Sequence, residues 1–107
     1  MNDVLYVEAA RVFAERVMKE GGTTPQQRIA YGFRMATARL PEPRESSILL
    51  DAFSHDFESF KAKPASALKY VSHGEHPRDE HLDVNELAAY TSVMSLVLNL
   101  NETIMKE

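Results

Sequence analysis

Apolar residues recur along this chain at the spacing of one helix face, which predicts a series of amphipathic α-helices. In residues 3–20 the apolar positions are spaced i, i+4, i+7 and i+11: Tyr6, Ala10, Phe13 and Val17. The opposite face is predicted to be exposed, with ion pairs worth about 0.2–0.5 kcal/mol each; it carries Glu8, Arg11, Glu15 and Lys19. A glycine pair follows and supplies the left-handed backbone that ends a helix.

The next helix has start and stop signals in the sequence. Thr24 is typical of an N-cap, Pro25 suits the first helical position, and Gln27 can complete a capping box. Apolar residues at helical spacing follow: Ile29, Phe33, Ala36 and Leu40. The prolines in residues 41–43 cannot continue a helix, so this one is predicted to end at Leu40.

A third and a fourth helix are predicted in the middle of the chain. Residues 44–61 carry a bulky apolar stripe made of Leu49, Phe53, Phe57 and Phe60. Polar residues of the same segment are predicted to face away from that stripe: Asp51, His55, Asp56 and Glu58. Pro64 fits the start of a short fourth helix, in which Leu68 and Val71 are the expected apolar contacts.

The last quarter of the sequence predicts a buried central helix. Asp83 and Glu86 have the spacing of a capping box, and an almost unbroken apolar run continues to Leu100. Residues 72–82 contain Gly74, Pro77 and many charged groups, which is typical of a surface loop. With no alternating strand pattern in the chain, the fold is predicted to be all-α: a single compact bundle of about five helices with a central C-terminal helix.

Composition narrows the classes of function. The 107 residues, 44% of them hydrophobic, suffice for one domain with its own core. The absence of cysteine excludes disulfides, thiolate nucleophiles, zinc–thiolate sites and covalent Cys-x-x-Cys-His haem from this segment. A net charge of −4 argues against nucleic acid as a partner, and no apolar window approaches the length of a membrane span.

Short motifs occur in a characteristic order along the chain. They are Asn2-Asp3-Val4-Leu5-Tyr6-Val7-Glu8-Ala9-Ala10-Arg11, Arg28-Ile29, Phe33-Arg34, Arg39-Leu40-Pro41, Gly74-Glu75, Leu82-Asp83, Glu86-Leu87-Ala88-Ala89 and Leu98-Asn99-Leu100-Asn101-Glu102. In this order the chain resembles the C-terminal domain of unknown function of the planctomycete cytochrome-c-associated proteins. It departs from that pattern at Val4, where proline is usual, at Tyr90, where tryptophan is common, and at Asn101, where aspartate is common.

The resemblance implies that residues 1–107 are the C-terminal piece of a larger, exported, multi-domain protein. Such relatives often carry a Cys-x-x-Cys-His haem domain ahead of this piece, so haem is expected in another domain and no cofactor in this one. The expected partners are the other domains of the parent chain, and the expected location is periplasmic or extracytoplasmic. The resemblance supplies no catalytic residue.

The loop at residues 72–82 holds the one concentration of metal-ligating side chain types. His73, His76 and His81 lie there among carboxylates. Zinc sites on helices use histidines at i and i+4, whereas Gly74 and Pro77 make this segment irregular. A solvated loop is therefore the favoured interpretation, and a metal site is the alternative.

Two further clusters have a structural and a functional interpretation. Glu75 could form a bidentate ion pair with an arginine of the second helix, or the arginines could bind an anionic ligand; the candidates are Arg28, Arg34 and Arg39. His55 has Asp51 and Glu58 at helical spacing and could be oriented as a general base, but no nucleophile accompanies it in the sequence.

The polar end of the last helix also allows two interpretations. Asn99, Asn101 and Glu102 could cap the helix and begin a turn, or could form a partner-docking surface. Methionines at helical spacing are interpreted as core filling rather than as haem ligands; they are Met18, Met35 and Met94. Met105 is interpreted as a helix-end residue.

The sequence therefore favours a noncatalytic packing or interaction module. The alternative is a small-ligand, carbohydrate or metal-binding domain that uses residues 73–81, although the chain has no tryptophan and four tyrosines to line a pocket. An enzyme would have to rely on His55 or on the histidine loop.

Overall fold

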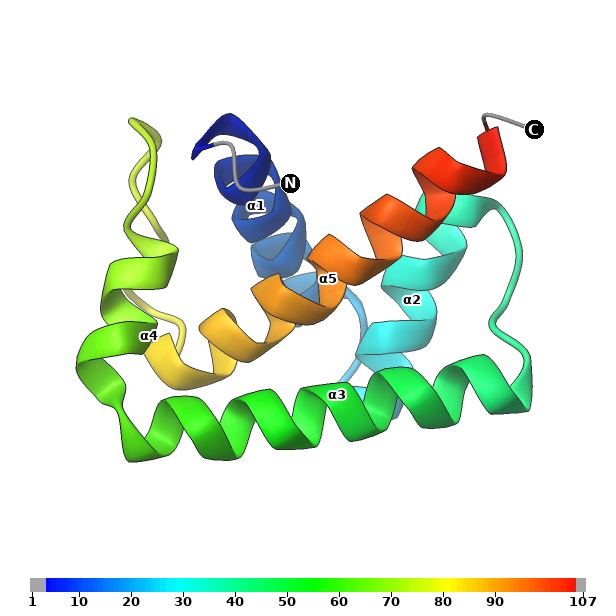
Figure 1. Cartoon of the computed structure of the whole chain (residues 1–107), viewed down its shortest axis with the longest axis horizontal. Helices are drawn as coiled ribbons and strands as arrows, with labels where there is room; N and C mark the ends of the chain where they lie inside the picture. Colours follow the sequence, from blue (N-terminus) through cyan, green and yellow to red (C-terminus); the bar gives the residue numbers. More distant parts are fainter. Residues whose placement is uncertain (1–3, 106–107) are drawn as a thin grey trace.

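The computed structural model describes the backbone of residues 4–105 and the side chains of residues 6–100. It contains five α-helices: α1 (Val4–Glu20), α2 (Pro25–Thr37), α3 (Pro43–Ala62), α4 (Pro64–Val71) and α5 (Val84–Met105) (Figure 1). The described part contains no strand, and its dimensions are 36 × 26 × 22 Å. The all-α prediction is confirmed.

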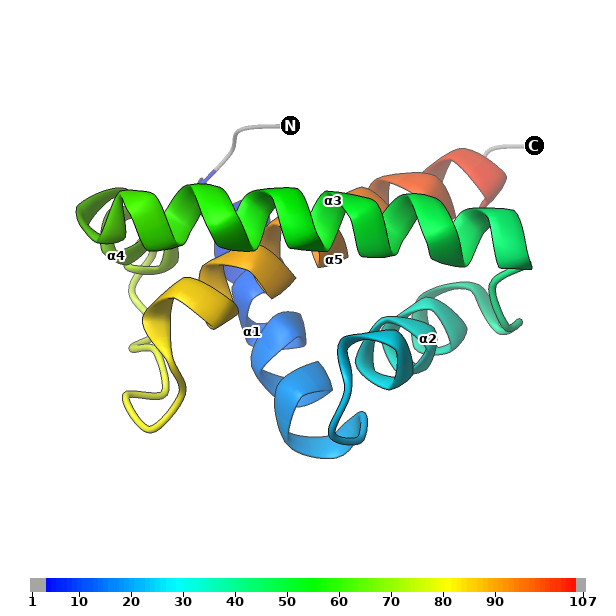
Figure 2. The same cartoon turned by 90° about the horizontal axis from the view of Figure 1, so that it is seen from below.

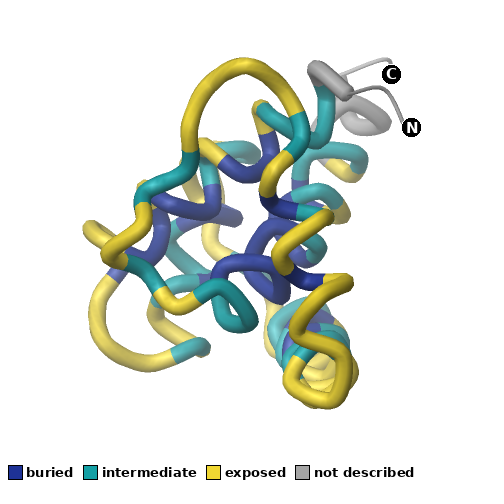
Figure 3. Tube along the Cα trace, turned by 90° about the vertical axis from the view of Figure 1, so that its left-hand side faces the viewer, coloured by how far each residue is buried: buried dark blue, intermediate teal, exposed yellow. Residues whose placement is uncertain are grey.

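Helix α5 lies at the centre of the fold and contacts each of the other four helices. Two perpendicular views show α1 and α2 behind α5, while α3 runs along one side of the molecule (Figures 1 and 2). The buried side chains of α5 are Leu87, Ala88, Ala89, Tyr90, Thr91, Val93, Met94 and Val97. Buried segments accordingly gather in the interior, and the loops are exposed (Figure 3). The predicted central helix is confirmed.

The core joins α5 to the apolar faces of its neighbours. The centre of the Tyr90 ring lies 4.4 Å from that of Phe53 on α3, which belongs to the predicted phenylalanine stripe. On α2, the absent side chain of Gly32 allows close approach, because a Cβ there would lie 2.5 Å from Met94 Sδ. The Thr91 hydroxyl donates to the Leu87 carbonyl at 2.7 Å, so this polar group is satisfied inside the core.

The predicted helix starts are largely confirmed. Thr24 and Gln27 form the reciprocal capping box of α2. At α5, the Glu86 N–H donates to Asp83 Oδ2 at 2.8 Å. The Glu86 carboxylate, however, accepts from Arg28 at 3.2 Å, which ties the start of the central helix to α2.

The predicted end of α2 at Leu40 is wrong. The helix stops at Thr37, and Ala38 adopts a left-handed conformation with φ 64°, its N–H donating to the Arg34 carbonyl. The chain thus leaves the helix before it reaches the prolines. Leu40, which was predicted to face the core, is 59% exposed.

The prediction for α4 is also partly wrong. Ala67 and Val71, four residues apart, are buried against the core, whereas Leu68 is 46% exposed. A helix of two turns presents one narrow row of side chains to its neighbours. In α4 this row contains Ala67 and Val71, so Leu68 lies outside it.

None of the helices in the described part is both long enough and apolar enough to cross a bilayer.

Candidate functional site

The segment 72–82 lies against α1 and covers Arg11. The Arg11 side chain, predicted to be exposed, is 1% exposed and donates to the carbonyls of His76 and Pro77. It also donates to Glu15 Oε2 at 3.0 Å, and its Nε has no hydrogen-bond partner among the described residues. The exposed-face prediction for Arg11 and Glu15 is therefore wrong, because a segment more than 60 residues further along the chain covers them.

Carboxylates of α1 accept hydrogen bonds from the same segment in return. Glu15 Oε2 accepts from the Asp79 N–H at 2.8 Å, and Glu8 accepts from the His76 N–H. Gly74 has φ +90°, and a Cβ there would collide with the Glu8 carboxyl group, so this turn requires glycine. Gly74 thus has a structural role in this turn.

The three histidines of this segment are not brought together. His73 is half-buried, whereas His76 and His81 are exposed. His81 Nδ1 lies 3.2 Å from Asp79 Oδ1. Across the described residues, no group of three or more potential metal-ligating side chains is arranged to hold an ion.

Two of the three candidate arginines pair with carboxylates other than Glu75. Arg28 pairs with Glu86, and its guanidinium lies 5.6 Å from the centre of the Tyr90 ring. Arg39 follows the end of α2 and makes a bidentate contact with Glu45 at 2.8 and 2.9 Å. Within the described part of the chain, neither Arg34 nor Glu75 forms an ion pair, so the predicted pairing with Glu75 is wrong.

Two carboxyl groups are held ionised by neighbouring cations. The hydrogen bond from Arg39 and the backbone N–H of Glu42 lower the pKa of Glu45 to about 2. The hydrogen bond from Lys19 lowers the pKa of Asp79 to about 2. The first contact fixes the connection between α2 and α3, and the second fixes the segment 72–82 on α1.

We expect stability to fall in acid because of these two groups. Their pKa values in the folded state lie below the ordinary carboxyl values of about 4. Their contribution is therefore present above about pH 4.5 and is lost as the pH falls towards 2. Thermal unfolding between pH 5 and pH 2 tests this, and Glu45→Gln should show a flatter dependence; an unchanged slope in that variant would contradict the assignment.

The remaining predicted polar residues do not form a catalytic arrangement. His55 and Asp51 are exposed on α3, as predicted, and no hydrogen bond joins His55 to Asp51 or Glu58 in the described structure. Helix α5 continues to Met105, so Asn99 lies within the helix and does not cap it. The side chains of Asn101 and Glu102 lie outside the described residues.

An apolar groove lies between α3 and the C-terminal half of α5. Phe33 of α2 lines it together with three residues of α3 and two of α5, and its volume is about 310 Å³. The exposed apolar side chains in it are Ile48, Leu96 and Leu100. Leu96 and Leu100 fall in the apolar run predicted for the last helix, whereas Ile48 lies outside the stripe predicted for the third, and the sequence did not indicate that the two helices leave these residues uncovered.

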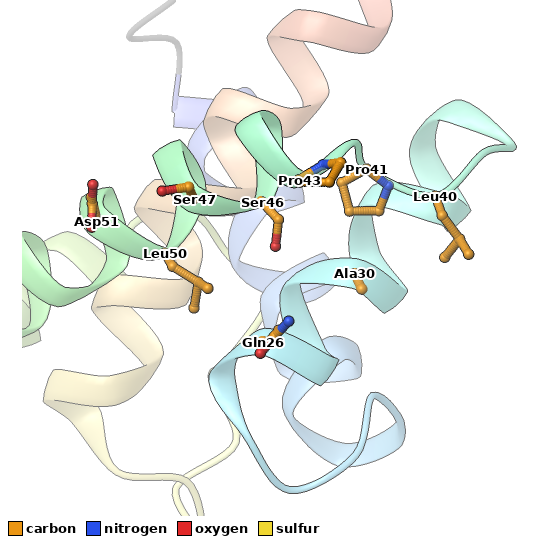
Figure 4. A pocket seen from close by; sticks show the side chains of 9 residues that line it. All are labelled: Gln26, Ala30, Leu40, Pro41, Pro43, Ser46, Ser47, Leu50 and Asp51. Carbon is orange, nitrogen blue, oxygen red and sulfur yellow. The ribbon is translucent and has the colours of Figure 1, made fainter.

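A second hollow lies between α2 and α3 (Figure 4), with a volume of about 530 Å³. Its apolar lining comes from Ala30, Leu50 and the proline-rich connection, and Asp51 lies at the end away from Leu40. A further hollow of about 660 Å³ shares Ala30 and Leu40 with it and contains Arg34 and Met35.

No family model, no curated protein and no solved structure matches this chain.

Proposed function

We propose that this chain is a noncatalytic helical interaction module of a larger exported, haem-associated protein. The groove between α3 and α5 is the surface through which it binds a neighbouring domain of that protein. The export and the haem association rest on the resemblance described above, whereas the docking role rests on the groove.

The observation that carries the docking role is the exposure of bulky apolar side chains in this groove. Ile48 is 57% exposed, Leu96 48% and Leu100 38%. Phe33 supplies an apolar floor beneath them, and Glu45 is the one charged residue among those that line the groove. Apolar patches of this kind on a small domain are typical of interaction sites.

The chemistry of the described residues agrees with a noncatalytic role. Glu45 and Asp79, whose pKa values are lowered to about 2, each pair with a nearby cation in a different part of the structure rather than together in one hollow. The buried Arg11 and Glu15 hold backbone groups of the segment 72–82, which is a structural task. An active site, by contrast, usually brings perturbed groups together in a concave region.

The test uses the domain encoded immediately upstream of Met1. Produced as a separate polypeptide, that domain is expected to bind the full chain with a Kd of about 1 µM, measured by calorimetry. Ile48→Glu should weaken binding at least about tenfold, because it places a charge in an apolar contact.

Leu68→Glu is the matched control, because Leu68 is exposed on α4 and outside the groove. It should leave the Kd unchanged. Equal weakening by both variants, or the absence of any upstream domain that binds, would overturn the proposal.

A further inference from the structure

Leu40 is the most exposed of the large apolar side chains in the described part of the chain, at 59%. It lies between two hollows, and it lines both of them together with Ala30. Both hollows combine apolar residues with polar ones, among them Gln26, Ser46 and Ser47 in the hollow between α2 and α3, so Leu40 is an apolar projection beside a partly apolar depression.

The connection that carries Leu40 is held rigidly. Ala38 turns the chain with φ 64°, and prolines follow Leu40 at positions 41 and 43. Arg39 is fixed by its two contacts with Glu45 and lies 4.9 Å from the centre of the Phe33 ring. A side chain held in place before binding loses little conformational freedom when it is buried in a contact.

Opposite charges flank this surface at its two ends. Arg34 belongs to the hollow on one side of Leu40, and Asp51 lies at the far end of the other hollow (Figure 4). Neither residue forms an ion pair with any residue that the structure describes. The order along the surface is therefore Arg34, the projecting Leu40, the partly apolar hollow between α2 and α3, and Asp51.

We infer that this surface binds a second copy of the chain about a two-fold axis. A two-fold axis between Leu40 and the α2–α3 hollow places Leu40 of each copy in that hollow of the other. The same axis brings Arg34 of each copy opposite Asp51 of the other, so the surface is self-complementary in shape and in charge.

The inference is independent of the proposed function, since it uses a different surface. The contact is small, so the expected Kd of the dimer is roughly 10–100 µM, weaker than for interfaces of standard size.

Sedimentation equilibrium of the full chain tests the inference. The average mass is expected to rise from 12.1 kDa towards twice that value with increasing protein concentration. Leu40→Asp should raise the Kd of the dimer at least about 30-fold, as expected for a central anchor. Leu68→Asp, the matched control on α4, should leave it unchanged.

A charge exchange identifies the two-fold geometry. Arg34→Asp and Asp51→Arg should each be monomeric alone, because each creates two like-charge contacts in the dimer. Mixed in equal amounts, they should form a heterodimer, because both contacts then join opposite charges. Both positions are exposed, so folding of the variants is expected to match the wild type and can be checked by thermal unfolding.

Three results would overturn the inference. The first is a mass that stays at 12.1 kDa up to about 1 mM protein, well above the expected Kd. The second is association that persists in Leu40→Asp, which would place the dimer contact on a different surface of the chain. The third is a mixture of the two charge variants that stays monomeric while the wild type dimerises.

Discussion

Replacing Arg11 with methionine is expected to lower the free energy of unfolding by about 3–5 kcal/mol. The substitution keeps much of the side-chain volume but removes the donors to Glu15 and to the carbonyls of His76 and Pro77. Those acceptors would remain partly buried without a partner, which is costly. Urea unfolding followed by circular dichroism measures the loss.

Arg16→Met is the matched control on the same helix. Arg16 pairs with Glu20 on the surface, where both side chains are about half exposed, and solvent screens such a pair, so Arg16→Met should change the free energy of unfolding far less than Arg11→Met. Arg11→Met should also speed cleavage by trypsin after Arg78, because the segment 72–82 loses part of its attachment to α1. A variant with wild-type stability and an unchanged cleavage rate would show that Arg11 does not hold this segment.

Replacing Leu87 with alanine is expected to lower the free energy of unfolding by about 2–5 kcal/mol. Leu87 is fully buried in the first turns of α5, where this helix contacts its neighbours, so the substitution leaves a cavity in the core. The loss is measured by the same urea unfolding experiment. This position tests whether α5 organises the fold.

The same substitution at Leu68 is the control. The sequence pattern predicts that Leu68 is a core contact of α4, whereas the structure leaves it 46% exposed. We therefore expect Leu68→Ala to cost less than about 1 kcal/mol, in line with ordinary surface substitutions. Equal losses at the two positions would contradict the burial that the structure assigns to α4 and α5.

Local signals in the sequence predicted most of the helices and their starts. Thr24 with Gln27 predicts the capping box of α2, and the phenylalanines of α3 predict which face packs on Tyr90. Both depend on residues within one or two helical turns, so the spacing alone carries the information. The end of α2 was mispredicted because Ala38 takes a left-handed conformation that alanine seldom adopts.

The candidate sites were less predictable, because each involves contacts between distant parts of the chain. The pattern of α1 placed Arg11 on a solvent-facing surface, but the segment 72–82 folds back over it. The predicted pairing of Glu75 with an arginine failed because Arg28 and Arg39 meet Glu86 and Glu45 instead. The sequence shows which side chains are charged. Which carboxylate each arginine meets depends on how the helices are arranged in space, and this is seen only in the tertiary structure.

The sequence by itself determined an all-α domain with a central C-terminal helix. Periodicity, caps and prolines act within a few residues, so they specify which segments are helical and which face of each is apolar. The tertiary structure alone decided that Arg11 is buried, that α3 and α5 leave Ile48 and Leu96 uncovered, and that Leu40 projects between two hollows. These outcomes depend on how helices of unequal length cross one another, and no local pattern encodes that geometry.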